Sequence, residues 1–361
     1  MATEVTLPPR LDWIEVAKGI GITFVVLVHS MIPWLNPVTI HLSSFTIPLF
    51  FVLGGLTYNN ERHRGDLRSF AISRGKQFLI PYFCLYALMM GLFVPLSPSI
   101  DTALTPSDVL FWFLYGNGPP LSASHLWFLP VMYFGLMAFV VADKLMRNLP
   151  SNSRLILIVI FPLLAVGIQA LFHPNLVPWR VSGILISATF ALFGNIMRDF
   201  RGLGTWMTRS RVDDFAAFII LSVLLILVSS LNGFTDIAVD NFGVNVYLYL
   251  AAGLTGTTIV FLASGVIAFS SRPKNLFKGL GKNSQELYEI HPVAFYIVPL
   301  IGVILSLPLG APELHDMLWP ARFFLGVAVG FVLTKYVITR NRILSVIFRG
   351  SPRTISTEKT T

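Results

Sequence analysis

Residues 14–35 have the sequence IEVAKGIGITFVVLVHSMIPWL, which after Lys18 contains no Asp, Glu, Lys or Arg. At 1.5 Å per residue, a helix of this length is about 33 Å long, enough to cross a hydrocarbon core roughly 30 Å thick. No small-residue cleavage pattern follows the apolar run, so we expect it to stay in the protein rather than to be removed as a signal peptide. The segment therefore predicts a membrane-spanning helix at the start of the chain.

The same pattern recurs along the sequence. We predict an all-α, polytopic membrane protein with about ten spans. The apolar patch Val109–Tyr115 is too short to span and is predicted to be an interfacial or re-entrant piece. The predicted spans are residues 14–35, 42–58, 78–96, 126–141, 155–172, 181–197, 215–231, 244–269, 287–307 and 318–338.

The overall composition supports this class. Of the 361 residues, 54% are hydrophobic and 12% are charged, whereas soluble domains carry about 25% charged residues. The formal net charge is +8, and we assign it to cytoplasmic loops and anionic lipid headgroups rather than to nucleic-acid binding. Cys84 is the only cysteine, which excludes an intramolecular disulfide and a cysteine-based metal cluster.

The basic residues alternate loop by loop. Lys and Arg near the ends of spans favour the cytoplasmic side of a membrane. All but two of the 26 Lys and Arg fall at the termini or in alternate loops, and only Arg180 and Arg322 fall on the other side. This pattern predicts an even number of spans with both termini in the cytoplasm. We predict one membrane domain over residues 1–345, followed by a polar, disordered cytoplasmic tail over residues 346–361.

The first predicted span carries two residues that could do chemistry. Lys18 and His29 lie eleven residues apart, which is almost three helical turns, so they share one face roughly 16 Å apart along the axis. Lys18 lies at the cytoplasmic mouth, where a Lys can also simply extend to the interface. A titratable His inside a span is costly and usually marks a site. We predict that His29 is a catalytic base or an acyl carrier, with a packing role as the alternative.

A second cluster lies in residues 281–292, GKNSQELYEIHP, which lead into the ninth predicted span. Asn283 and Glu286 stand three residues apart, as in a capping arrangement, and could serve only to start a helix. Glu289 and His291 lie deeper in the predicted span and are predicted to be catalytic. A purely structural pair of an acid and an imidazole is the alternative.

Two cations begin the third predicted span, in residues 74–82, RGKQFLIPY. Arg74 and Lys76 are predicted to bind the phosphates of a donor substrate, because Arg grips phosphate through paired donors. Anchoring of the span at the cytoplasmic interface is the alternative.

Four residues near the predicted outer ends of spans are candidate acceptor contacts. His125 and Trp127 lie at the start of the fourth span, where a solvated loop His and an ordinary aromatic belt residue are the alternatives. Arg180 and Arg322 break the charge rule and are predicted to bind an anionic or sugar-rich acceptor. The sequence lacks a Walker phosphate loop, a His-Glu-x-x-His pair and a Gly-x-Ser-x-Gly elbow, so we predict no metal site and no nucleotide-driven pump.

Taken together, these motifs resemble the integral membrane acyltransferase-3 family, especially its short stand-alone members related to fucose 4-O-acetylase. The most specific element is a basic residue, ten intervening residues and a His in the first span, which Lys18 and His29 match. Supporting matches lie at residues 50–55 (FFVLGG), 74–82 (RGKQFLIPY), 127–129 (WFL) and 281–292 (GKNSQELYEIHP).

Two features depart from the family pattern. Members often have two arginines three residues apart before the third span, whereas here Gln77 follows Arg74 at that distance. Lys76 is the candidate substitute, although Lys lacks the planar fork of Arg. Members often have Ser-Gly where this chain has Gly54-Gly55. The chain also shows no appended esterase-like domain, so the membrane part must complete the transfer.

The resemblance implies an O-acyltransferase that moves an acyl group, most often acetyl from acetyl-CoA, to a hydroxyl of a cell-surface or lipid-linked carbohydrate. It implies acyl-CoA as a co-substrate rather than a permanently bound cofactor, and a place in a bacterial inner membrane. In this scheme Lys18, Arg74 and Lys76 contact the donor. A proton-coupled transporter or flippase of a glycan or small solute is the alternative, because buried His and Glu also relay protons.

Overall fold

The structure is a computed structural model that describes residues 12–32, 34–59, 65–96, 105–117, 124–146, 148–149, 153–199, 212–295, 297–305 and 316–351. Within these ranges the regular secondary structure is helical, apart from one isolated β-bridge between Asp236 and Asn241. The all-α prediction is therefore confirmed for the part of the chain that is described. Of the predicted polar tail, residues 352–361 lie outside the described residues.

The helices follow one another with short 3-10 turns between some of them. Their bounds are α1 (Asp12–Met31), α2 (Pro37–Leu56), α4 (Leu67–Leu96), α5 (Pro106–Tyr115), α6 (Phe128–Leu145), α7 (Arg154–Phe172), α8 (Val181–Asp199), α10 (Val212–Asn232), α11 (Val246–Ile267), α12 (Ser271–Lys282), α13 (Ser284–Phe295), α14 (Ile297–Leu305), α16 (Trp319–Tyr336) and α17 (Arg342–Arg349).

Among the described residues, eight helical segments are long and apolar enough to cross a bilayer. They coincide with eight of the predicted spans and centre on α1, α2, α6, α7, α8, α10, α11 and α16. The other two predicted spans, residues 78–96 and 287–307, fall in α4 and in the pair α13 and α14. Pro292 lies inside α13, and its ring removes a backbone donor and crowds the preceding turn. The structure describes this segment as α13 and α14, on either side of residue 296, which lies outside the described residues.

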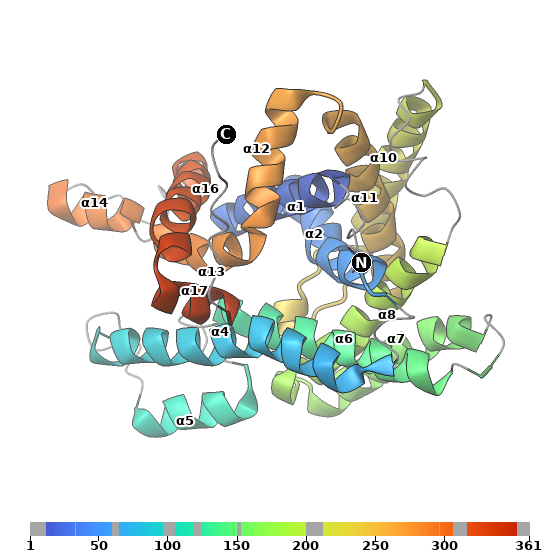
Figure 1. The fold of residues 1–361 in the computed structure, drawn as a ribbon, viewed down its shortest axis with the longest axis horizontal. Coiled ribbons are helices and arrows are strands. Elements are labelled where there is room, and N and C mark those ends of the chain that lie inside the picture. Colours follow the sequence, from blue (N-terminus) through green and yellow to red (C-terminus); the bar gives the residue numbers. More distant parts are fainter. Residues whose placement is uncertain are drawn as a thin grey trace, which may run out of the picture.

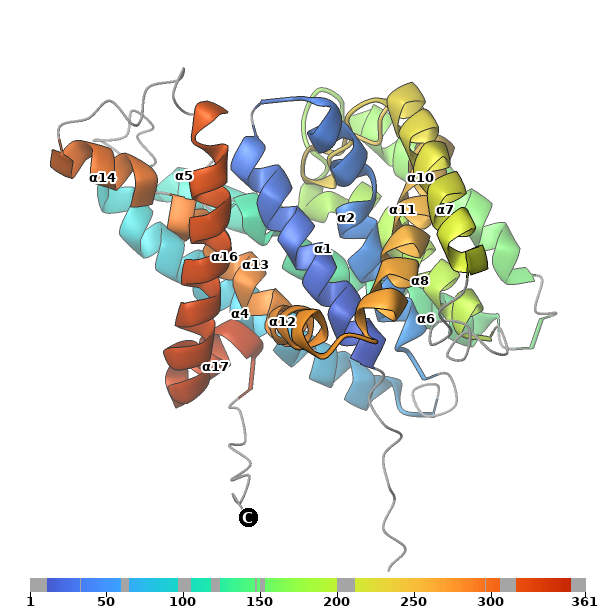
Figure 2. The same cartoon turned by 90° about the horizontal axis from the view of Figure 1, so that it is seen from above.

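Helix α1 lies at the centre of the molecule. It packs against α2, α11, α12, α13 and α16, and Figure 2 shows it running diagonally among these helices. Helices α4, α6 and α7 lie together along one side in Figure 1, with the short α5 outside α4. Helix α8 joins the two parts because it packs against α2 as well as against α6 and α7.

Glycine lets α1 and α12 approach each other at backbone contact. A Cβ built on Gly19 would lie 2.0 Å from the carbonyl oxygen of Phe277, and one built on Gly281 would lie 1.8 Å from the carbonyl oxygen of Glu15. No larger residue fits at these distances, and small residues are the usual means of close helix packing in membranes. The contact fixes how α1 is turned, and therefore where its Lys18 points.

The outer helices α7 and α10 present large apolar side chains to the surroundings. Soluble monomers rarely expose apolar faces of this extent, and these faces suit contact with lipid tails. The fold therefore has the character of a polytopic membrane protein. The exposed side chains are Leu155, Ile156, Val159, Ile160, Leu163, Leu164 and Val166 on α7, and Phe215, Ile219, Ile220, Val223, Leu224, Ile226 and Leu227 on α10.

Helix α17 follows the last candidate span. It packs against α4 and α13, begins after Asn341, whose side chain accepts from two backbone N–H groups, and ends at Gly350. The predicted domain boundary at residue 345 therefore lies inside a helix. Figure 2 shows α17 at the same end of the molecule as the first turn of α1.

Candidate active site

Three cavities follow one another along α1. The first, which we call the polar vestibule, is lined by residues that include Lys18, Lys76, Lys282 and Arg349. The second, the central cavity, has about 780 Å³ of space between its walls, including space open to solvent. The third, the histidine cavity, is lined by residues that include Val25, His29, Thr46, Trp127, Asp236 and Tyr288.

Adjacent cavities share wall residues. Lys18, Gln77 and Gln285 line both the polar vestibule and the central cavity. Val25 and Tyr288 line both the central cavity and the histidine cavity, as does Ile47 of α2. The three cavities therefore form one series, interrupted by a thin wall of three side chains.

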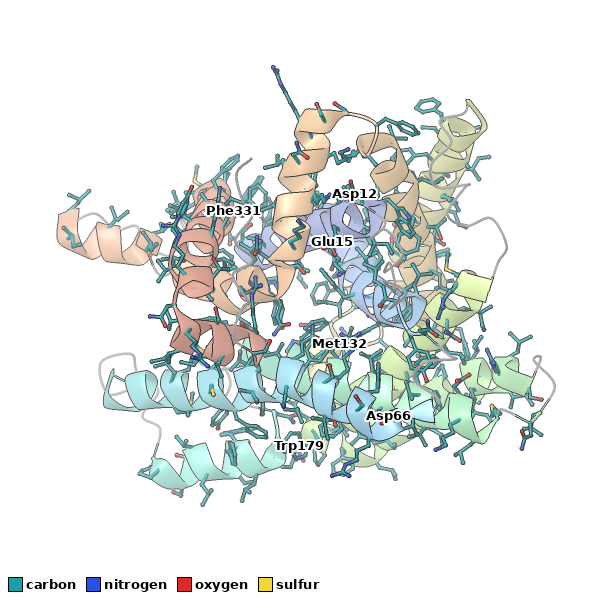
Figure 3. All side chains as sticks on the ribbon, in the orientation of Figure 1. Asp12, Glu15, Asp66, Met132, Trp179 and Phe331 are labelled. Atoms are coloured by element: carbon teal, nitrogen blue, oxygen red, sulfur yellow. The ribbon has the colours of Figure 1, made fainter. Side chains whose placement is uncertain are left out.

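The central cavity lies between two groups of helices. Its walls come from α1, α2, α4, α6 and α13, and its lining is mainly apolar. The polar groups in the lining include Lys18, Arg74, Gln77 and Gln285. Figure 3 shows Met132 of α6, one of the lining residues, between the layer that contains α4 and the helices α1 and α2. A Cβ on Gly54 would lie 2.8 Å from the Met132 side chain. The glycine at this position therefore leaves the cavity wider than serine would.

His29 lies in the last turn of α1 and is partly buried. Its Nδ1 is 2.9 Å from the carbonyl oxygen of Val25, one turn earlier. Because a carbonyl only accepts, Nδ1 carries the proton in the neutral imidazole, and the lone pair is on Nε2. This tautomer is the one required of a base or nucleophile that acts through Nε2.

Two more histidines lie beside His29. The ring centroids of His29 and His291 are 4.9 Å apart, and those of His125 and His291 are 6.4 Å apart. His291 is fully buried, and its Nδ1 lies 2.7 Å from the carbonyl oxygen of Tyr288. The described part of the chain contains no group of three or more His, Cys, Asp or Glu arranged to hold a metal ion.

Tyr288 forms the wall between the central and histidine cavities. Its hydroxyl donates to the carbonyl oxygen of His125, and its ring packs against Phe128, with centroids 5.0 Å apart. Both contacts hold the ring across the series of cavities. The sequence reasoning missed this residue, because an aromatic in an apolar helix is an ordinary packing residue.

The predicted donor residues lie at the other end of the series. Lys18 lines both the vestibule and the central cavity, and its Nζ is 3.5 Å from Oε1 of Glu15. Arg74 lines the central cavity and donates from Nη1 to Gln77 at 2.7 Å. Lys76 lines the vestibule. The structure thus brings all three predicted cations to adjoining cavities.

Glu289 has a hydrogen-bond partner of its own, separate from those of the two predicted catalytic histidines. It is buried, and its Oε1 accepts from Gln285 at 3.1 Å. Neither Glu289 nor His291 lines any of the three cavities, whereas His29 lines one. Glu289 and His291 therefore have separate hydrogen-bond partners, Gln285 and Tyr288.

The four predicted acceptor contacts fall into two groups. Trp127 lines the histidine cavity, and His125 packs against His291. Arg180 and Arg322 are buried and line none of the three cavities. Arg180 forms an ion pair with Asp240 at 3.9 Å, while Arg322 of α16 donates twice to the carbonyl oxygen of Ser30, at 2.9 and 2.6 Å.

Asp236 is a further candidate that the sequence reasoning missed. It lies in the connection between α10 and α11, which folds back so that Phe234, Thr235 and Asp236 line the histidine cavity with His29. Its Oδ1 accepts from the backbone N–H of Ala238 at 2.8 Å. Burial raises the pKa of the Asp236 carboxyl, while the nearby His29 opposes this shift. In the sequence it is one of several polar residues in a loop, which gives no signal.

Comparison with known proteins gives one finding. A family model described as an acyltransferase domain, that of acyltransferase 3, matches residues 11–338. The curated proteins and the solved structures contain no match to the chain. The matched region includes every described residue of the histidine cavity and the central cavity.

Proposed function

The chain belongs to the acyltransferase-3 family of membrane acyltransferases, and we propose that it moves an acetyl group from cytoplasmic acetyl-CoA to a hydroxyl of a cell-surface or lipid-linked carbohydrate. One observation carries the proposal: His29 lies in a cavity that shares a three-residue wall with a second cavity lined by Lys18 and Arg74. The cations line the central cavity, and the base lines the adjoining histidine cavity. Two adjoining cavities of this kind suit a reaction whose donor and acceptor arrive from opposite sides.

The donor is proposed to enter through the polar vestibule. CoA carries several phosphate charges, and Lys and Arg bind phosphate strongly. Lys76 lies in the vestibule, and Lys18 and Arg74 lie in the central cavity. The acyl arm of CoA would extend from these cations along the apolar walls toward Tyr288. In this scheme α1 has its Lys18 end in the cytoplasm. The proposed topology has ten spans, counting α4 and the α13 and α14 pair, with both termini cytoplasmic in a bacterial inner membrane.

The acceptor is proposed to bind in the histidine cavity. Trp127 offers an aromatic surface for a sugar ring, and Thr46 and Asp236 offer polar groups for its hydroxyls. His125 lies one layer behind, against His291. Arg180 and Arg322 remain predicted acceptor contacts, and both are engaged with protein groups in this structure.

His29 is proposed to act as the base. Its Nε2 takes the proton of the acceptor hydroxyl as that oxygen attacks the thioester carbonyl carbon. The carbon–sulfur bond then breaks, and the proton passes to the leaving sulfur, which gives an ester and free CoA thiol. In the alternative route Nε2 first takes the acyl group, releasing CoA, and then passes it to the acceptor. His291, within ring contact of His29, is proposed to support either route.

The test is transfer of label from radiolabelled acetyl-CoA to a crude lipid-linked glycan by the purified protein. We expect His29→Ala to lose transfer by at least about a hundredfold, because a positioned base contributes that much. The control is His173→Ala, since His173 is exposed after α7. Retained transfer in His29→Ala would remove His29 from the mechanism. Failure of the wild type to consume acetyl-CoA with any acceptor would favour the transporter alternative.

A further inference from the structure

Helix α17 reaches the mouth of the donor path although it lies beyond the family domain. The family model ends at residue 338, whereas Arg349 and Ser351 line the polar vestibule together with Lys76 and Lys282. The segment after residue 338 is therefore part of the wall of this cavity.

Arg349 is held in place by α13. Its Nε forms an ion pair with Glu286, and its Nη2 donates to Oδ1 of Asn283 at 3.0 Å. Gln285 adds a bond from its Nε2 to the carbonyl oxygen of Phe348 at 3.2 Å. The Asn283 and Glu286 pair, whose spacing suggests a helix cap, thus binds the last residue of α17.

Gly350 lets the chain pass directly over α4. Its φ is +68°, and a Cβ on it would lie 1.5 Å from the carbonyl oxygen of Lys76. A residue other than glycine is excluded by both the left-handed backbone and the contact. This close passage places Arg349 beside the turn of α4 that carries Lys76.

The charges of the vestibule favour an anion. Its lining has four cations, Lys18, Lys76, Lys282 and Arg349, against two carboxylates, Glu15 and Glu286. The guanidinium of Arg is suited to phosphate because its donors match two phosphate oxygens. The vestibule continues into the central cavity through the shared residues Lys18, Gln77 and Gln285.

We propose that Arg349 binds a phosphate of the CoA donor, and that α17 with Gly350 forms the mouth of the donor site. This inference rests on the proposed function. It adds Arg349 to the proposed donor residues. Arg349 lies outside the family domain and outside the motifs of the first, third and ninth predicted spans.

The test measures thermal stabilisation of the full chain in detergent by CoA and, separately, by pantetheine, which lacks the nucleotide and its phosphates. A ligand that binds only the folded state stabilises it by an amount that grows with the logarithm of the ratio of ligand concentration to Kd, so weaker binding gives a smaller rise in Tm at the same ligand concentration. We expect Arg349→Gln to weaken CoA binding about tenfold, as loss of one hydrogen bond to a charged group does, and to leave the pantetheine response unchanged. Arg342→Gln is the matched control, because it removes the same charge from the exposed start of the same helix.

A second variant protects the test against a folding defect. Ser351 lines the vestibule but takes no part in the Glu286 ion pair. Ser351→Glu should therefore weaken CoA binding through repulsion between the new carboxylate and phosphate, and should leave pantetheine binding unchanged. Wild-type affinity for CoA in both Arg349→Gln and Ser351→Glu would overturn the inference and leave the proposed function standing. Equal loss of CoA and pantetheine binding in Arg349→Gln would show a structural role only and also overturn it. A wild type that binds no CoA would overturn the proposed function itself.

Discussion

His29 owes its position to contacts on both sides of it along α1. Its Nδ1 is bound to Val25 within the helix, and the carbonyl of the next residue, Ser30, accepts two bonds from Arg322. Ser30 is fully buried, so this carbonyl would otherwise be an unsatisfied group at the end of a helix. Arg322 therefore satisfies the end of α1 and fixes the turn from which His29 projects.

Replacing Arg322 by Lys should disturb this turn, because Lys has no fork with which to donate twice to one carbonyl. We expect Arg322→Lys to lower kcat about tenfold to a hundredfold through misplacement of the base, with the KM for acceptor unchanged. The measurement is steady-state kinetics with varied acceptor. A raised acceptor KM at unchanged kcat would instead support the sequence prediction that Arg322 binds the acceptor.

Asp236 gives a pH-dependent prediction. Burial raises its pKa above the ordinary value of 3.8, and His29, Arg180 and Asp240 are the charged or titratable groups that act on it. The carboxyl therefore stays protonated to a higher pH than usual, and it can offset a proton taken up by His29 only above its raised pKa. We expect Asp236→Asn to be slower than the wild type above that pKa.

The rate ratio of wild type to Asp236→Asn should thus fall toward one as the pH is lowered through a midpoint above 3.8. The measurement is the pH profile of acetyl transfer for the two proteins over the range in which both stay folded. A ratio that does not change with pH would mean that the charge of Asp236 has no part in the reaction.

At the scale of the element, apolar length predicts the spans, because it is a local property of the sequence. The eight candidate spans overlap predicted segments for this reason. The basic stretch of residues 272–282 has the sequence pattern of a polar loop. These residues nevertheless form part of α12, whose Lys278 binds Asp12 of α1 at 2.5 Å. A polar helix of this kind depends on contacts with a distant segment, and the local pattern does not contain them.

Glycines at helix contacts give a prediction at the same scale. A Cβ on Gly55 of α2 would lie 1.7 Å from the carbonyl oxygen of Ala191 in α8, whereas a Cβ on Gly167 of α7 meets nothing within 4 Å. We expect Gly55→Ala to lower the Tm of the detergent-solubilised protein strongly, since backbone must move. Gly167→Ala should leave Tm unchanged or raise it, by about 0.5–1 kcal/mol in stability, because Ala favours a helix. Equal Tm values for the two variants would contradict the packing of α2 against α8.

At the scale of the whole molecule, the three cavities put the candidate residues in order. Lys18 and His29 could be paired from the sequence, because both lie on one face of one helix. Asp236, Gln285 and Arg349 could not be assigned to these cavities from the sequence. They lie in the connection between α10 and α11, in α13 and in α17, and their positions depend on how these segments pack against distant helices. The order from vestibule to histidine cavity is meaningful for the proposed reaction only if the two ends face opposite sides of the membrane.

The single cysteine makes this orientation directly testable. In a Cys84→Ser background, we would introduce one cysteine at a time by Leu35→Cys and Val244→Cys near the histidine-cavity end, and by Leu276→Cys and Ile343→Cys on α12 and α17. All four side chains are exposed, so labelling reports on the side of the membrane rather than on burial. A membrane-impermeant maleimide added to intact cells, with the outer membrane permeabilised, should label the first two variants. In inverted inner-membrane vesicles it should label the last two.

Labelling of Leu276→Cys and Ile343→Cys from opposite sides would mean an odd number of crossings between α12 and α17, and would refute the even count beyond the eighth predicted span. Labelling of all four variants from the same side would refute a donor path and an acceptor cavity that open on opposite sides.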